Sequence, residues 1–299
     1  MTVAVSAQPA KIAWVSFHAG DNAPSAGAAS VGFTQAPDIG YTTLLTGAGY
    51  NVTRIVTAND FNVSSLYAYD LVIIGRGVDS SHYQQANETA AWNGFTGKLI
   101  DMSGYTLRGS RLGWTTGDTI PDTSGTVTLK PVGLHPIFQG IPVDGATGNM
   151  FNPFATAVTY TAYGTNVTAR GISVNTNPLE GGGKVLATVG TPGDPAFGGA
   201  LIALWGPDWS NPTADPQPGV TKINGGTDVL GGWRMAFLSG SRERDGISPQ
   251  TAGIFDLTPD GAKLFLNSVN YFLTVVPEPS SVALFAIGGL ALLLRRKKA

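Results

Sequence analysis

The chain contains no cysteine and only three histidines. Without cysteine there is no disulfide framework, no thiolate metal site and no cysteine nucleophile, which excludes several classes of secreted scaffold and of enzyme. Histidine is the usual general base near neutral pH, and it stands only at His18, His82 and His135. A catalytic or metal-binding site would therefore have to be built from these three residues or from carboxylates and hydroxyls.

Charged side chains are also scarce. Asp, Glu, Lys and Arg make up 13% of the chain, against about 25% in a typical soluble domain. The formal net charge is -2 and the densest basic cluster stands at the extreme C-terminus, so the sequence offers no basic surface that would follow a phosphate backbone. We expect no nucleic-acid partner, and a polar but weakly charged surface of the kind found outside the cytoplasm.

The longest hydrophobic run lies near the C-terminus. Val282 to Leu294 is interrupted only by Gly288 and Gly289, and Arg295-Arg296-Lys297-Lys298 follows it. As a helix the run would be roughly 20 Å long at about 1.5 Å per residue, shorter than the roughly 30 Å of a bilayer core, so flanking serines and snorkelling basic side chains must extend it. We expect one transmembrane helix at 281–294, with the basic cluster in the cytoplasm and the body on the other side of the inner membrane.

The residues in front of this run complete a pattern. Val276-Pro277-Glu278-Pro279-Ser280-Ser281 contains a short rigid Pro-Glu-Pro element. Together with the apolar segment and with Arg295 and Arg296, it resembles the PEP-CTERM sorting signal of Gram-negative bacteria over residues 276–299. The resemblance implies that an exosortase and the inner membrane are transient partners, and that the body reaches the periplasm, the cell surface or the extracellular matrix. The alternatives are an ordinary C-terminal tail anchor and a buried core helix.

Export requires an entry signal, and the N-terminus has part of one. Residues 1–10 lack a basic start and a full hydrophobic core, but Val5-Ser6-Ala7 has the small residues of a cleavage site before Gln8. We interpret residues 1–10 as the remnant of a signal peptide and hypothesise a start codon further upstream. A genomic sequence without a Lys/Arg-led hydrophobic extension would contradict this.

The body, residues 11–275, alternates strand and helix patterns in its first half. Strands are predicted at 12–17, 51–56, 70–75 and 98–102, and helices at 38–46 and from Asp79 to Gly94. The aliphatic run at 70–75 is typical of a parallel strand that is covered on both faces. Alternation of this kind predicts βαβ units and a parallel sheet.

The middle of the body, residues 103–182, is richer in Gly, Thr, Asn and Pro, and we expect loops and antiparallel strands there, including pieces at 127–129 and 157–160. Further strands are predicted at 184–189, 200–205 and 233–239. A final helix should begin with Thr258 as its N-cap and Pro259 as its first residue, because Ala262, Phe265, Val269 and Phe272 recur at helical spacing.

This layout predicts an α/β fold, flavodoxin-like or class I glutamine amidotransferase-like. We expect a mostly parallel sheet with helices on both faces and a β-rich insertion at 103–182. Two phrases, at 135–141 and 257–265, resemble the trehalose-utilisation-type branch of the class I glutamine amidotransferase-like superfamily. Enzymes of that superfamily often present a Cys on a tight turn after a strand. This chain has no Cys, so amidotransferase activity does not carry over.

A serine is the remaining candidate nucleophile. Ser103 follows the strand at 98–102, although Gly-x-Ser-x-Gly is not satisfied around it. Ligands of open α/β sheets bind outside the carboxyl ends of the strands. His18 could therefore meet Ser103 there as its base, with Arg76, Trp205 and Arg242 converging on the same cleft. The alternative is that His18 and Ser103 are hydrogen-bonded loop and turn residues.

Two further candidate sites each have an ordinary structural explanation. Trp205, Asp208 and Trp209 could form a sugar-binding shelf, or the tryptophans could be core residues. The pairs Asp118/Asp122 and Asp208/Asp215 could hold calcium, or could form local Asx turns. No metal-ligand motif and no phosphate loop occurs, and we expect no metal and no cofactor.

These observations predict an exported surface or matrix protein that is noncatalytic and binds carbohydrate, with extracellular polysaccharide as the expected partner. The alternative is a secreted hydrolase or carbohydrate-modifying enzyme that uses the strand-end cleft. The fold alone cannot distinguish them, because function depends on the site.

Overall fold

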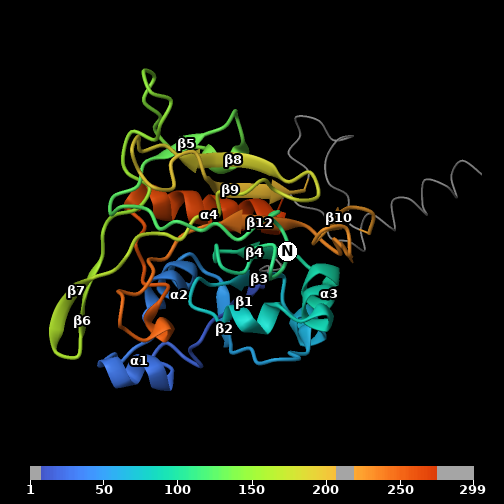
Figure 1. Cartoon of the computed structure of the whole chain (residues 1–299), viewed down its shortest axis with the longest axis horizontal. Coiled ribbons are helices and arrows are strands. Elements are labelled where there is room, and N and C mark those ends of the chain that lie inside the picture. The colour runs from blue at the N-terminus through green and yellow to red at the C-terminus, as the bar shows by residue number, and fades with distance from the viewer. Residues whose placement is uncertain (1–7, 207–218, 275–299) are drawn as a thin grey trace, which may run out of the picture.

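The computed structural model describes residues 8–206 and 219–274. An eight-stranded sheet with the order β2-β1-β3-β4-β12-β9-β8-β5 forms its centre (Figure 1). These strands are β1 (Lys11–Val15), β2 (Asn51–Ile55), β3 (Leu71–Ile74), β4 (Leu99–Asp101), β5 (Leu129–Pro131), β8 (Lys184–Val189), β9 (Ala200–Trp205) and β12 (Arg234–Phe237). Strands β2, β1, β3, β4 and β12 run parallel to one another, whereas β9, β8 and β5 extend the sheet in antiparallel pairs.

Helices cover both faces of this sheet. The α-helices are α1 (Ala26–Val31), α2 (Ile39–Gly47), α3 (Ala86–Gly94) and α4 (Pro259–Thr274), and the 3₁₀ turns are η1 (Val63–Ala68), η2 (Ser80–Tyr83), η3 (Pro136–Phe138) and η4 (Pro249–Thr251). Arg234 and Phe237 stand three positions apart on β12 and so point to opposite faces. Arg234 donates to carbonyls in α3, whereas the Phe237 ring lies 5.3 Å from that of Phe265 in α4. Tyr41 of α2 also contacts Phe265, at 5.8 Å, so α2 and α4 share one face and α3 covers the other.

The strand predictions succeeded because the central strands are buried on both sides. Every residue of β3, β4 and β12 is buried, and such continuous apolar runs are typical of parallel strands between helix layers. The α/β class with a mostly parallel sheet and helices on both faces is confirmed.

The predicted β-rich middle contributes to two places. β5 joins the edge of the central sheet through β8, and β6 (Thr159–Ala162) with β7 (Thr165–Thr168) forms a separate hairpin that reaches α1 (Figure 1). The hairpin turn is anchored there, since the Tyr163 amide donates to the Val31 carbonyl at 2.8 Å and the Tyr160 and Phe33 rings lie 5.6 Å apart. A second small pair, β10 (Lys222–Ile223) with β11 (Asp228–Val229), packs against α3.

One local prediction was wrong, and one short helix was missed. The helix expected from Asp79 to Gly94 is divided, because Asp79 caps only η2 and α3 begins separately after Gln85, which forms a capping box with Glu88. The short helix α1, whose N-cap is Ser25, was not predicted. The final helix does begin at Pro259, and Thr258 Oγ1 accepts a hydrogen bond from the Gly261 amide as an N-cap should.

The C-terminal predictions concern residues that the structure does not describe. The sorting residues Pro277, Glu278, Pro279, Arg295 and Arg296 lie outside the described ranges, as do the expected transmembrane segment at 281–294 and most of residues 1–10. Within 8–206 and 219–274, none of the helices combines the length and the apolar character that crossing a membrane requires.

Candidate functional site

The carboxyl ends of β1, β3, β4 and β12 open onto a pocket. These strands are parallel, so the segments that follow them meet at one edge of the sheet. The pocket has a volume of about 280 Å³, close to the lower limit of roughly 300 Å³ for small-molecule sites. Its lining comprises Phe17, Arg76, Val78, Asp79, Ser80, Tyr105, Arg242, Glu243, Pro249 and Gln250.

Arg76 is the most deeply buried charged residue of this pocket. It follows β3 between two glycines, and a Cβ at Gly77 would lie 2.6 Å from the Ala252 carbonyl oxygen, so only glycine allows this close passage. The Arg76 side chain is 6% exposed. Its Nη2 donates to Ser173 Oγ at 3.4 Å, its Nε has no hydrogen-bond partner, and burial lowers its pKa.

Tyr105 holds three guanidinium groups around its ring. The centroid lies 4.7 Å from Arg76 Cζ, 5.0 Å from Arg108 Cζ and 5.1 Å from Arg242 Cζ. Each distance is within the range of a cation–π interaction. Arg108 is also fixed through its Nε, which donates to the Tyr105 carbonyl at 3.0 Å, and through its Nη2, which donates to Ser80 Oγ at 3.4 Å.

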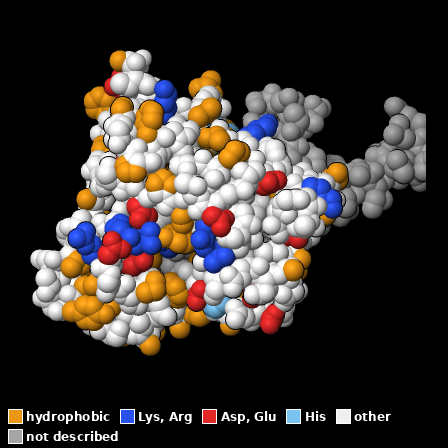
Figure 2. All heavy atoms as spheres, viewed as in Figure 1, with side chains coloured by type: hydrophobic (Ala, Val, Ile, Leu, Met, Phe, Trp, Pro, Cys, Tyr) orange, Lys and Arg blue, Asp and Glu red, His pale blue; other side chains and the backbone are white. Residues whose placement is uncertain are grey.

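Arg242, unlike Arg76, is neutralised by carboxylates. Its Nη1 lies 3.1 Å from Asp122 Oδ2 and its Nε lies 3.6 Å from Glu243 Oε1. Burial lowers the pKa of Arg242, but Asp122, Tyr105 and Glu243 outweigh this and raise it. Arg170 shares both carboxylates and pairs with Asp245 at 2.6 Å. Figure 2 shows basic and acidic side chains mixed in groups on the face drawn, rather than a field of one sign.

Asp101 lies at the end of β4 and is completely buried. Its Oδ1 accepts from the Ser103 amide at 2.9 Å and its Oδ2 accepts from Thr106 Oγ1 at 2.5 Å. Burial raises the pKa of Asp101 to about 7, although these two hydrogen bonds and the Arg76 charge oppose the shift. The carboxyl group therefore titrates near neutral pH and holds the Ser103 turn in place.

The structure shows no hydrogen bond between the side chains of His18 and Ser103. His18 Nδ1 accepts from the Ser25 amide at 3.0 Å, which leaves the ring proton on Nε2. His18 Nε2 and Ser103 Oγ are both buried without a hydrogen-bond partner, and neither residue lines the pocket. Burial lowers the pKa of His18, with Asp38 and Arg54 acting in opposite directions. His18 is thus positioned as a cap for α1 and not as a base for Ser103.

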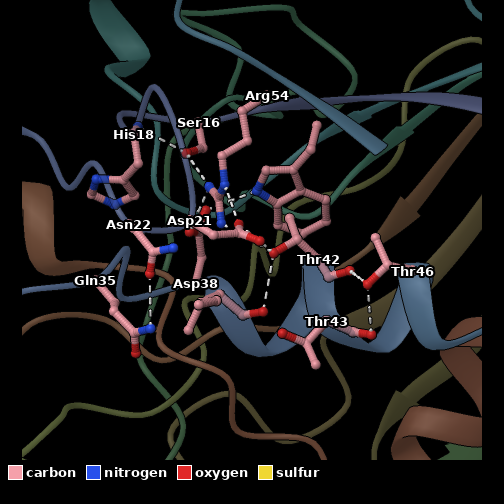
Figure 3. A network of polar contacts seen from close by, with 12 residues as sticks. Ser16, His18, Asp21, Asn22, Gln35, Asp38, Thr42, Thr43, Thr46 and Arg54 are labelled. Atoms are coloured by element: carbon pink, nitrogen blue, oxygen red, sulfur yellow. Dashed lines mark hydrogen bonds and ion pairs between the residues drawn. The ribbon is translucent and has the colours of Figure 1, made fainter. Parts of the chain in front are cut away.

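The polar residues around His18 belong to a structural network (Figure 3). Arg54 of β2 pairs with Asp38 at 2.8 Å and with Asp21 at 2.7 Å, and it donates to Ser16 Oγ at 3.1 Å. Asp38 Oδ2 also accepts from Trp14 Nε1 at 2.8 Å. Asp21 therefore forms an ion pair with Arg54 and not with His18. The network connects the ends of β1 and β2 to the start of α2.

Trp205 lies far from the pocket, contrary to the prediction. It pairs in register with Arg234, at the beginning of β12 and hence at the opposite edge of the sheet from the parallel strand ends. The side chain is 1% exposed, its Nε1 donates to the Glu180 carbonyl at 2.8 Å, and its ring lies 5.2 Å from that of Trp114. Trp205 is a core residue, and Asp208 and Trp209 lie outside the described residues.

The aspartates considered for calcium make other contacts. Asp118 accepts from the Ser110 amide at 3.0 Å, and Asp122 accepts from Ser173 Oγ at 2.7 Å while pairing with Arg242. Asp118 thus contacts a residue eight positions earlier, and Asp122 makes contacts across 51 and 120 positions, in place of the Asx turns considered from the sequence. Asp215 lies outside the described ranges, and within those ranges no cluster of His, Asp and Glu could hold a metal ion.

The sequence predictions identified two pocket residues, Arg76 and Arg242, and missed Tyr105 and Gln250. Tyr105 stands four positions after the end of β4. The argument that selected Ser103, that ligands bind beyond the carboxyl ends of the strands, could therefore have selected Tyr105 as well. Gln250 belongs to η4, and its Oε1 accepts from the Gly27 amide at 2.8 Å. No local pattern reveals that a loop at 249–251 will return to β1 and α1, because this contact spans more than 200 positions.

Comparison with known proteins identifies the C-terminal segment. Residues 275–298 match the PEP-CTERM protein-sorting motif. The chain therefore carries a PEP-CTERM signal, which implies exosortase processing and export to the cell envelope or surface. No curated protein sequence matches the chain.

Solved structures resemble the chain at low sequence identity. A ThuA-like protein from Bacteroides uniformis is 10% identical, with 94% of this chain and 96% of that chain covered and a TM-score of 0.49. A ThuA-like protein from Parabacteroides merdae is 12% identical, with coverage of 89% and 90% and a TM-score of 0.41. A GMP synthase subunit from Thermoplasma acidophilum is 11% identical, with coverage of 89% and 96% and a TM-score of 0.41. Because these TM-scores are below 0.5, the fold class is assigned from the strand order and strand directions of the sheet and not from the similar structures.

Proposed function

We propose that the chain is a noncatalytic protein of the cell envelope or surface, and that its strand-end pocket binds extracellular carbohydrate. The observation that supports this most directly is the pocket itself. It places guanidinium groups, an aromatic ring and an amide around a space of about 280 Å³ at the edge where α/β sheets bind ligands. Such a mixture of directed donors and an aromatic wall suits a polar, hydroxyl-rich molecule of about one sugar residue.

The arrangement of side chains favours binding over hydrolysis. A serine hydrolase needs its base within hydrogen-bond reach of the nucleophile. In the described part of the chain, Ser103 Oγ is buried and bonded to nothing, while the Asp101 carboxylate beside it is occupied by Ser103 N and Thr106 Oγ1. A hydrolase would require rearrangement of both groups.

Binding of the purified full chain to a panel of bacterial polysaccharides would test this function. Tyr105→Ala removes the ring at the centre of the pocket and should weaken binding of a recognised polysaccharide at least tenfold. Tyr163→Ala is the matched control, because Tyr163 is 61% exposed on the distant β6–β7 hairpin. Binding that Tyr105→Ala does not change would contradict the proposal.

The same samples test the enzymatic alternative. Incubation of the wild-type chain with each bound polysaccharide should release no new reducing ends. If reducing ends appear with turnover, and Ser103→Ala abolishes them, the protein is a hydrolase and the noncatalytic proposal is wrong.

A further inference from the structure

The charges of the strand-end pocket are unevenly paired, although its lining contains two arginines and two acidic residues, Arg76, Arg242, Asp79 and Glu243. Arg242 and Arg170 share Asp122, Glu243 and Asp245. Within the described ranges, neither Arg76 nor Arg108 has a carboxylate within ion-pair distance. A buried charge without a counter-charge is costly, and proteins normally pair such groups or use them.

Arg76 is more deeply buried than Arg108. Only 6% of it is exposed, and its side chain lines the pocket. Its Nε is buried without a hydrogen-bond partner, and its Nη2 makes one long hydrogen bond, to Ser173 Oγ at 3.4 Å. A guanidinium presents its donors as a planar fork that matches a carboxylate in a bidentate manner. Tyr105 supports the fork from its ring face, at 4.7 Å, and so holds it in one orientation.

We propose that this pocket recognises the carboxylate of an acidic sugar, with Arg76 as the principal carboxylate-binding residue and Arg108 as a second positive charge at its side. This inference rests on the proposed carbohydrate-binding function and specifies its ligand as a uronic acid unit. The hydroxyls of the sugar would meet Ser80 and Gln250, whose Nε2 remains a donor after Oε1 has accepted from the Gly27 amide.

The acidic residues of the pocket favour a singly charged ligand. Asp79 and Glu243 also line it. Partial burial raises the pKa of Asp79, but the hydrogen bonds from Ser81 outweigh this and lower it, so Asp79 is ionised at neutral pH. A phosphate dianion would be repelled by these carboxylates more strongly than a carboxylate monoanion. One sugar carboxylate, by contrast, would supply Arg76 with the direct ion pair that it lacks.

The experiment compares two ligands that differ at a single carbon. Isothermal titration calorimetry of the full chain at pH 7 with methyl β-D-glucuronide and methyl β-D-glucoside measures what the carboxylate contributes. We expect the glucuronide to bind at least tenfold more tightly, and its binding to weaken as salt rises. Inorganic phosphate, titrated in parallel, should bind more weakly than the glucuronide.

Substitutions assign the effect to Arg76. Arg76→Gln and Arg76→Met should each weaken glucuronide binding at least tenfold, and the melting temperature of Arg76→Met should not fall, because the substitution removes a buried charge that has no ion pair. Arg244→Gln removes an exposed arginine outside the pocket and should leave binding unchanged. If the Arg76 variants do not fold, Arg108→Gln replaces them and should weaken binding several-fold.

The outcomes separate this inference from the proposed function. Equal binding of glucuronide and glucoside, or glucuronide binding that survives Arg76→Gln, overturns the acidic-sugar inference, while polysaccharide binding that is sensitive to Tyr105→Ala would still uphold the proposed function. Phosphate binding as tight as that of the glucuronide also overturns it, because the pocket would then recognise oxyanions in general. Loss of all saccharide binding removes the proposed function together with the inference.

Discussion

At the scale of single residues, two buried carboxyl groups beside strand ends have pKa values shifted towards neutral pH. Burial raises the pKa of Asp101 to about 7 and that of Asp256 to about 6. Asp256 lies after β12 and accepts from the Gly240 amide and from Ser241 Oγ. Both residues therefore hold turns that follow parallel strands, and both titrate in the range that an exported protein encounters.

The sign of their effect on stability follows from proton binding. Between about pH 4 and pH 7 the folded state keeps the proton of Asp101 while the unfolded state has lost it, so stability falls as pH rises through this window. Asp256 acts in the same direction up to about pH 6. His18 acts oppositely below its ordinary pKa, because burial lowers its pKa and the unfolded chain binds the proton first.

Asp101→Asn isolates the contribution of Asp101. The side-chain amide of the variant can donate to Thr106 Oγ1, because the Thr106 hydroxyl can itself donate to the Ser103 carbonyl, 2.7 Å away. Unlike the carboxyl group, the amide does not titrate in this pH range. Between pH 5 and about pH 7 we expect the variant to gain stability relative to the wild type by about 1.4 kcal/mol for each pH unit, or roughly 2–4 °C per kcal/mol, and the difference should then stay constant to pH 8. Thermal melts across this range provide the measurement.

A surface aspartate serves as the control for that series. Asp144 has a lowered pKa, chiefly through the Ala146 amide, so Asp144→Asn should leave the slope between pH 5 and pH 8 as it is in the wild type. If Asp101→Asn shows the same slope as the wild type, the Asp101 carboxyl is ionised throughout and the raised pKa is wrong.

At the scale of elements, one buried arginine joins α3 to the sheet. Arg234 on β12 is completely buried, and its Nη2 donates to the carbonyls of Trp92 and Asn93, each at 3.2 Å, and of Phe95. Its Nη1 donates to the Gly97 carbonyl at 2.9 Å. A helix C-terminus leaves its last carbonyls unpaired, and here a cation satisfies them from the neighbouring strand.

Arg234→Met should therefore destabilise the protein strongly. It leaves several carbonyl oxygens buried without donors, and we expect a loss of about 3 kcal/mol, which corresponds to a fall of roughly 6–12 °C in melting temperature. Amide hydrogen exchange in α3 should accelerate more than exchange in α4. The exposed Arg244→Met provides the matched control, and a melting temperature within about 2 °C of the wild type would show that Arg234 is dispensable.

The same elements show what the sequence could and could not predict. Strands β3, β8 and β9 were placed correctly because continuous aliphatic runs mark them without reference to distant residues. The break between η2 and α3 was missed, because the Glu88 carboxylate that caps α3 is buried and also accepts from the distant Asp60 amide. Local patterns carry no record of such tertiary contacts.

The candidate site could be predicted only in part for the same reason. Arg76 and Arg242 were selected because they follow predicted strands, and both do line the pocket, since they stand two and five positions after the ends of the parallel strands β3 and β12. The same argument failed for Trp205, because β9 runs antiparallel to β12 and ends at the other edge of the sheet. Strand direction depends on topology, which the residues of β9 alone do not encode.

At the scale of the whole molecule, a cysteine-free body is joined to a sorting tail. The body needs no disulfide because its core is continuous from β1 to α4 and includes large aromatic residues on both faces of the sheet. Its stability therefore does not depend on the redox state of its compartment.

The tail leads to the last prediction. Protein recovered from a host that has an exosortase should have a mass that ends near Pro277, since the PEP-CTERM motif spans 275–298, whereas the same chain expressed without an exosortase should retain the basic residues 295–298. Intact-mass spectrometry distinguishes the two forms. Glu278→Ala should reduce processing in the first host, and Glu180→Ala, in the body, should not. Retention of the basic residues in a host with an active exosortase would mean that the tail is a permanent part of the protein, and the inferred release of the body from the inner membrane would be wrong.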